Sequence, residues 1–200
     1  MKKILIILFL AGAFQSNAQR FGSRSAPEKC WAVFHPFAAV KIKKIYRNAL
    51  PLYEEAKKNK VPDAFSNGGK LDAFRHVYFM AAFTQKVKAG KVRKLGIAHE
   101  KGNYNDFKKG IEEDGEIPDS LSTVMDLKNN ETGISIGSEN KTSDLKTLSE
   151  LVIKALKNGE AYYLKRDLSG NYLGCNNEII DKERYKGKWY MPKCLTRTNN

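Results

Sequence analysis

The chain has 200 residues, of which 42% are hydrophobic and 28% are charged, and its formal net charge is +13. This composition can support a packed core, and it excludes a wholly disordered or collagen-like chain. The sequence contains no internal repeat and no long low-complexity tract, so we expect one basic globular domain.

Residues 1–18 have the pattern of a secretory signal peptide. A short basic start is followed by an apolar run over 4–14, and Ser16 and Ala18 are small residues at the positions that a signal peptidase reads. The run is too short for the roughly 20 residues of a spanning helix. We therefore predict cleavage after Ala18, no transmembrane span in the mature protein, and export to the periplasm or the extracellular space. Loss of two lysines with the signal peptide takes the net charge from +13 to +11.

The periodicity of the remaining chain predicts a mainly α fold in one helical domain, with a short β-hairpin or irregular tail behind it. We divide the chain into signal peptide, flexible lead-in, helical domain and tail, at 1–18, 19–34, 35–159 and 160–200. Apolar residues recur at steps of three and four. They predict about five helices, over about 35–59, 71–88, 91–99, 120–130 and 144–157.

Two of these segments allow a more detailed prediction. The helix over 71–88 is apolar on nearly every side, which is typical of a central buried helix. In the tail, Tyr162 to Leu164 and Tyr172 to Leu173 flank a turn, a pattern that favours a small hairpin.

Export permits disulfides, and the chain has three cysteines. Cys175 and Cys194 lie in the same tail segment, and a bond that closes this loop would contribute about 3 kcal/mol in the chain-entropy model. Cys30 would then be odd, but a bond from Cys30 to either of the others is an open alternative, because sequence does not fix connectivity.

Strongly polar residues interrupt the apolar helices at three places. The first holds Asp72, Arg75 and His76 within one turn of the central helix, so these side chains share a face. At the second, His99 continues an apolar stripe, which predicts an inward-facing imidazole, and Glu100 follows it. The third place contributes Asp126, Asn129 and Asn130. Burial of such groups is costly unless they find partners, so we expect them to meet one another.

A catalytic interpretation assigns chemistry to this cluster. His76, His99 and Asp126 are ligand types for a divalent metal such as zinc, with Glu100 as a base for the metal-bound water. Without a metal, His76 or His99 oriented by Asp126 could act as general base, and Arg75 could hold a carboxylate or phosphate.

In this interpretation Asp72, Asn129 and Asn130 help to hold the substrate. The alternative is a non-catalytic binding or structural module, in which the same side chains form a buried network that fixes helix packing. The two hypotheses differ in solvent access, since a catalytic cluster must open to a pocket.

Lysine-rich stretches over 41–44, 57–60 and 86–94 give the domain a basic surface. Such a surface could attract anionic polymers or lipids of the cell envelope. The alternative is an ordinary solvated helix face, because the lysines stand at helix-surface spacing. The chain shows no zinc-finger, recognition-helix or RNA-binding aromatic signature, so nucleic acid is not the partner we expect.

Three motifs in fixed order carry a resemblance to a known family. They are the segments from Asn67 to His76, from Ala98 to Glu100 and from Met125 to Gly133. Together they resemble an uncharacterised helical domain of bacterial secreted, wall-associated and polymorphic-toxin-like proteins, with a pattern similar to DAFRHA(Y/W), AHE and MDLxNNxxG. The resemblance covers about residues 35–140.

This chain departs from the family pattern at two points. Val77 stands where alanine is usual, and Phe79 with Met80 replaces a Trp-Asn type pair. The resemblance implies either an enzyme that acts on a polymer or lipid of another cell, or a housekeeping envelope protein.

Overall fold

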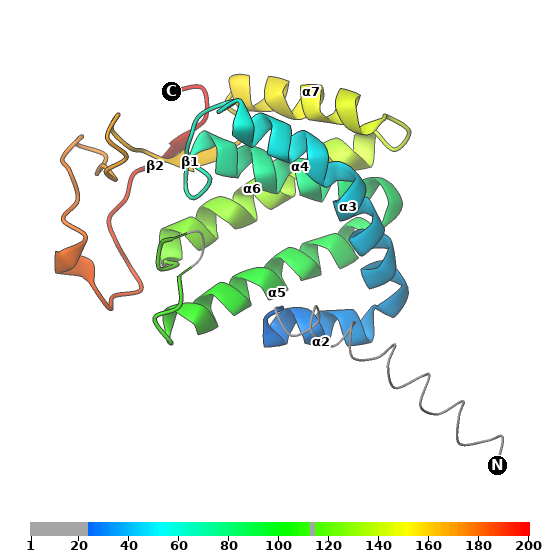
Figure 1. Cartoon of the computed structure of the whole chain (residues 1–200), viewed down its shortest axis with the longest axis horizontal. Coiled ribbons are helices and arrows are strands. Elements are labelled where there is room, and N and C mark those ends of the chain that lie inside the picture. Colours follow the sequence, from blue (N-terminus) through cyan, green and yellow to red (C-terminus); the bar gives the residue numbers. More distant parts are fainter. Residues whose placement is uncertain (1–23, 113–114) are drawn as a thin grey trace, which may run out of the picture.

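The computed structural model describes residues 24–112 and 115–200, which form six α-helices followed by a tail with a small sheet (Figure 1). The helices are α2 (Ala26–Phe34), α3 (Pro36–Lys58), α4 (Lys70–Lys86), α5 (Ala89–Phe107), α6 (Ser120–Glu139) and α7 (Leu145–Lys157). The tail contains β1 (Tyr162–Leu164), the 3-10 turn η1 (Glu183–Tyr185) and β2 (Leu195–Arg197). The predicted mainly α fold is confirmed, whereas the predicted signal peptide lies outside the described residues.

Helix α4 is the centre of the bundle, as its all-round apolar pattern predicted. It lies among α3, α6 and α7 in Figure 1, and its most extensive contact is with α6. Phe74, Val77 and Tyr78 are fully buried on it. In both described ranges no helix is long and apolar enough to cross a bilayer.

Helix α6 is longer than the sequence predicted. We expected it to end near Asn130, but it continues to Glu139. Gly133 and Gly137 are buried inside the helix, where they face the backbone of α4. These glycines therefore serve helix contact, and the packing energy outweighs their low helix propensity.

Helix α2 occupies part of the segment that we expected to be a flexible lead-in. Ser25 and Glu28 form a capping box, in which each side chain binds the other residue's backbone N–H, and Pro27 stands in the first turn. The indole N–H of Trp31 donates to the carbonyl of Lys91 at 3.0 Å and ties α2 to α5. The residues from Ala26 onward are thus part of the folded domain.

The tail differs from the predicted hairpin in its strand pairing. Strand β1 pairs antiparallel with β2, more than 30 residues away, and Tyr172 makes only an isolated bridge to Arg166. The disulfide joins Cys175 to Cys194, which confirms the first of the predicted pairings, and Cys30 is free and exposed.

Candidate active site around His76

The turn before α4 positions the first carboxylate of the site. Gly68 adopts φ +70°, a conformation that favours glycine, and its N–H donates to Asp72 Oδ2 at 2.6 Å. Asp63 caps the same helix by accepting from the N–H groups of Lys70 and Leu71, at 2.7 and 3.0 Å. The two interactions fix Asp72 in the first turn, where the helix dipole also favours a negative charge.

His76 lies one turn further along α4 and contacts groups from two helices. Its Nδ1 is 3.1 Å from Asn130 Oδ1 on α6. Its Nε2 is 3.2 Å from Asp126 Oδ1 and 3.5 Å from Asp72 Oδ1. Arg75 Nη2 completes the group, at 2.8 Å from Asp72 Oδ1 and 3.3 Å from His76 Nε2. We call these five residues the His76 cluster.

The hydrogen bonds define what the imidazole can do. Because the carbonyl oxygen of Asn130 can only accept, His76 Nδ1 carries the proton, and Nε2 is the atom that faces the two carboxylates. Nε2 also lies 3.3 Å from Arg75 Nη2, so a lone pair on this nitrogen would meet a guanidinium donor as well as the two carboxylates. Nε2 can therefore accept from Arg75, share a proton with a carboxylate, or bind a cation between Asp72 and Asp126.

The structure also gathers the three side chains that a metal ion would need. Asp72, His76 and Asp126 are buried, and one ligand atom from each lies within 4.8 Å of the others. His76 and Asp126 were predicted as metal ligands from the sequence, together with His99. The third ligand is Asp72 and not His99, because Asp72 shares a helix face with His76.

His99 lies beside the cluster and faces α2. Its Nδ1 is 3.5 Å from Glu28 Oε1, its ring centre is 6.5 Å from that of His76, and 36% of its side chain is exposed. The prediction of an inward-facing imidazole is correct only in part, because the ring faces α2 and stays partly exposed. Burial raises the pKa of Glu28, but the hydrogen bond and charge of His99 and the bonds from Ser25 lower it to about 2.

Glu100 points to α6, away from His99. Its buried Oε2 accepts from Thr123 Oγ1 at 3.0 Å and from Asn103 Nδ2 at 3.4 Å. Thr123 precedes Asp126 by one turn of α6, so Glu100 adds a third buried carboxylate to this part of the bundle.

Asn129, expected to help hold the substrate, has a different role. Its Nδ2 donates to the carbonyl of Tyr162 at 2.9 Å, and its Oδ1 accepts from the N–H of Tyr162 at 2.8 Å. Both ends of the amide therefore bind the backbone of β1. Asn129 attaches the sheet to α6, and the structure does not bring it into the His76 cluster.

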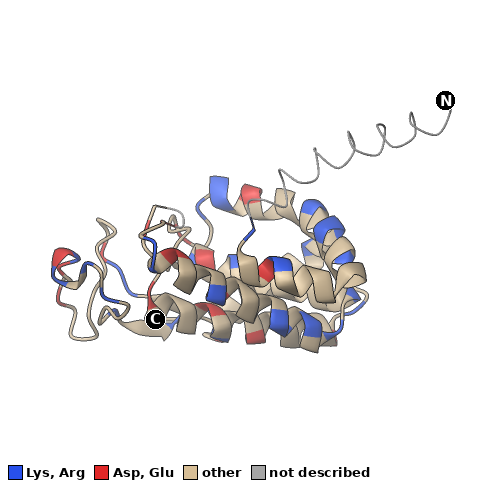
Figure 2. Cartoon of the chain, turned by 90° about the horizontal axis from the view of Figure 1, so that it is seen from below, with Lys and Arg blue, Asp and Glu red and all other residues tan. Residues whose placement is uncertain are grey.

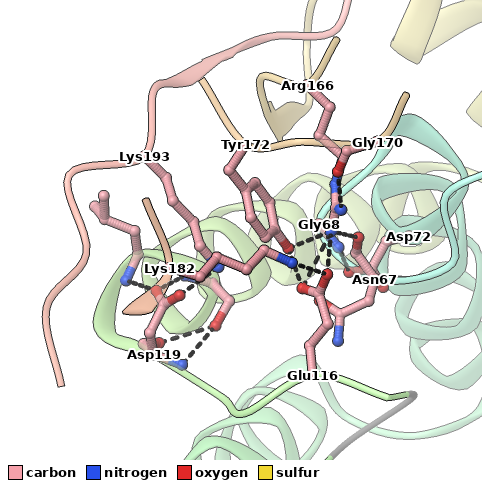
Figure 3. A network of polar contacts seen from close by, with 12 residues as sticks. Asn67, Gly68, Asp72, Glu116, Asp119, Arg166, Gly170, Tyr172, Lys182 and Lys193 are labelled. Atoms are coloured by element: carbon pink, nitrogen blue, oxygen red, sulfur yellow. Dashed lines mark hydrogen bonds and ion pairs between the residues drawn. The ribbon is translucent and has the colours of Figure 1, made fainter. Parts of the chain in front are cut away.

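A second polar network, which the sequence analysis missed, lies between the helical domain and the tail (Figure 3). Tyr172 donates to Glu116, and Arg166 Nη2 lies 3.1 Å from the same carboxylate. Arg166 also donates to the carbonyl of Asn67 at 2.9 Å, directly before Gly68. This network thus supports the turn that positions Asp72.

A buried ion pair between Lys193 and Asp119 extends the second network to the N-terminus of α6. Asp119 caps α6 through bonds from the N–H groups of Leu121 and Ser122, at 2.8 and 3.0 Å. Burial lowers the pKa of Lys193, and Asp119 opposes that shift. The tail therefore braces both helices that contribute to the His76 cluster.

Beside this network lies a pocket of about 320 Å³. Its polar lining includes Glu116, Tyr172, Lys182 and Lys193. Burial raises the pKa of Tyr172; it also raises that of Glu116, but the Tyr172 hydrogen bond and neighbouring cations bring it below the usual value. No local sequence pattern could reveal this site, since Glu116 lies 56 positions before its partner Tyr172.

Comparison with known proteins finds one family for most of the chain. A family model described as a domain of unknown function (DUF6973) matches residues 29–160, more than half of the chain. No curated protein and no solved structure matches the chain. The matched range contains the whole His76 cluster and ends before the tail residues of the second network. The chain therefore belongs to the DUF6973 family.

Proposed function

We propose that the protein is an exported hydrolase-type enzyme whose reaction centre is the His76 cluster. The observation that carries this proposal is the position of His76 Nε2 between two buried carboxylates, with Nδ1 held by Asn130. An imidazole that is oriented through one nitrogen, with its other nitrogen among charged groups, is the usual arrangement of a general acid or base.

Three residues of the cluster have direct roles in this mechanism. His76 would donate the Nε2 proton to the leaving group, and Asp126 would accept a proton from the attacking water. The Arg75 side chain is 21% exposed, whereas those of Asp72 and His76 are 3% and 7% exposed. Arg75 is thus the member that reaches solvent, and it would bind an anionic group of the substrate, such as a phosphate or carboxylate. This chemistry suits an anionic lipid or polymer of the cell envelope.

A second candidate is a metal-dependent hydrolase, favoured by the close approach of Asp72, His76 and Asp126. A divalent cation on these three residues would leave coordination positions for water and substrate, and would lower the pKa of the bound water. The two carboxylates suit manganese or magnesium, and the imidazole suits zinc.

The test is hydrolysis of a panel of substrates: a p-nitrophenyl ester, bis-p-nitrophenyl phosphate, phosphatidylglycerol vesicles and purified peptidoglycan. His76→Asn keeps a donor near the Nδ1 position and removes Nε2, so we expect activity to fall by roughly 100-fold or more. Thr84→Val is the matched control, because Thr84 is also buried on α4, and its hydroxyl donates to the Met80 carbonyl at 2.7 Å rather than to the His76 cluster.

Thermal melting with EDTA or added zinc distinguishes the general-acid enzyme, the metal-dependent enzyme and the non-catalytic module. If the enzyme depends on a metal, chelation lowers both the activity and the melting temperature of the wild type. It does not change the melting temperature of His76→Asn. If His76 acts as a general acid without a metal, chelation changes neither the activity nor the melting temperature of the wild type. If no substrate reacts and His76→Asn melts far below Thr84→Val, the cluster is a structural network, as in the non-catalytic module, and the proposal fails.

A further inference from the structure

The corner between α2 and α3 exposes an apolar surface that the bundle does not use. Val33, Phe34, Phe37 and Val40 are 68%, 74%, 86% and 71% exposed. Four large apolar side chains thus face solvent within eight residues, around the single residue that joins the two helices. Single exposed apolar residues are normal on proteins, but a contiguous group marks an interaction site. We call these four residues the corner patch.

The corner patch is flanked by positive charge. Residues 29–47 contain five lysines or arginines and no acidic residue. Phe37, Val40, Lys41 and Lys44 stand at i, i+3, i+4 and i+7 of α3, so the two exposed lysines share a face with the apolar side chains. The blue segments along α3 in Figure 2 show this basic ribbon.

We propose that the protein docks on an anionic lipid bilayer through the corner patch, with Lys41 and Lys44 at the level of the lipid headgroups. A bilayer interface accepts both features at once: the acyl region takes the aromatic and aliphatic side chains, and the anionic headgroups pair with the lysines. This inference goes beyond the proposed reaction and does not depend on it.

Two other occupants fit the patch less well. A second copy in a two-fold dimer would place the same surface against itself and bring the lysines of both copies together. A soluble anionic polymer would pair with the lysines, but it would leave Phe34 and Phe37 in water. Only the lipid interface satisfies both the charge and the apolar surface.

The experiment measures sedimentation of the purified protein with vesicles of phosphatidylcholine alone and of phosphatidylcholine with one quarter phosphatidylglycerol. All variants are compared in the same N-terminal form, established by mass spectrometry, so that residues 4–14 contribute equally. We expect binding to the anionic vesicles, weakened roughly tenfold or more by Phe34→Ser with Phe37→Ser. Lys41→Glu with Lys44→Glu should remove the preference for anionic vesicles.

Leu168→Ser is the matched control, because Leu168 is fully exposed but lies in the tail, and it should bind like the wild type. A second measurement uses the free thiol of Cys30, which is exposed one turn before Phe34. An environment-sensitive fluorophore on Cys30 should shift to the blue on anionic vesicles and keep its aqueous spectrum in buffer. Circular dichroism establishes that each variant is folded.

Three results would overturn the proposal. Equal vesicle binding by the wild type and the double Phe variant would exclude the patch as the contact. A dimer in lipid-free buffer that the double Phe variant dissociates would identify a second copy as the occupant. Loss of binding in the Lys variant alone, with the same loss on soluble polyphosphate, would identify a purely electrostatic surface.

Discussion

Gly133 of α6 lies so close to α4 that a Cβ atom on it would stand 2.3 Å from the carbonyl oxygen of Val77. One turn further, a Cβ on Gly137 would stand 2.2 Å from the carbonyl oxygen of Ala81. Real Cβ atoms do not approach backbone oxygens so closely. The absence of both side chains therefore sets the separation of the two helices, and with it the contacts of His76 with Asp126 and Asn130.

Gly133→Ala should destabilise the protein by about 3 kcal/mol, because the obstructing atoms are backbone and cannot rotate away. Urea denaturation measures this change. Gly90→Ala is the matched control, since a Cβ on Gly90 meets nothing within 4 Å and alanine favours the helix. We expect that control to be neutral or more stable by about 0.5 kcal/mol. Equal midpoints for the two variants would show that the helices can separate without cost.

Lys193→Met should destabilise the protein by about 3 to 5 kcal/mol, because it leaves the buried Asp119 carboxylate without its cation. The double variant with Asp119→Ser should recover much of that loss, since serine keeps the cap of α6 and removes the buried charge. A double-mutant cycle by urea denaturation tests the coupling. Additive effects in the cycle would mean that the two side chains do not stabilise each other.

Glu28→Gln should reduce stability at neutral pH by on the order of 1 to 3 kcal/mol, since the pKa of Glu28 is about 2 in the fold against an ordinary 4.5. A lowered pKa stabilises the folded state above pH 4.5, and this contribution is lost as the pH falls from 4.5 towards 2. The difference between wild type and variant should therefore shrink over that range.

Denaturation at pH 7, 5 and 3 measures the effect of Glu28. Glu131→Gln serves as its control, because Glu131 pairs with Arg93 on the exposed surface, where ion pairs contribute little. A gap between Glu28→Gln and wild type that stays constant down to pH 3 would contradict the assignment to the His99 pair.

Cys175→Ser with Cys194→Ser should lower stability by about 3 kcal/mol, which for a chain of this size corresponds to roughly 10 °C in melting temperature. The loss arises because the bond restricts the unfolded tail. Cys30→Ser should melt with the wild type, since the Cys30 thiol is free and exposed. A similar shift in all variants would argue for a different set of disulfides in solution.

The sequence by itself located five of the six described helices and identified the central one, although it missed α2 and ended α5 and α6 too early. Helices are local structures, and their apolar spacing of three and four is visible in any short window. Helix α2 could have been found in the same way, because its capping box of Ser25 and Glu28 is a local signal. The burial of polar residues on apolar helices also predicted that His76 and Asp126 would meet.

Only the tertiary structure decided which polar groups meet, and how the tail packs. His99 pairs with Glu28 because α2 covers that face of α5, and Asn129 binds the backbone of β1. The pairing of β1 with β2 and the contacts of Tyr172 join segments far apart in the sequence. Such contacts depend on how whole elements pack in space, and no short window of residues contains that information.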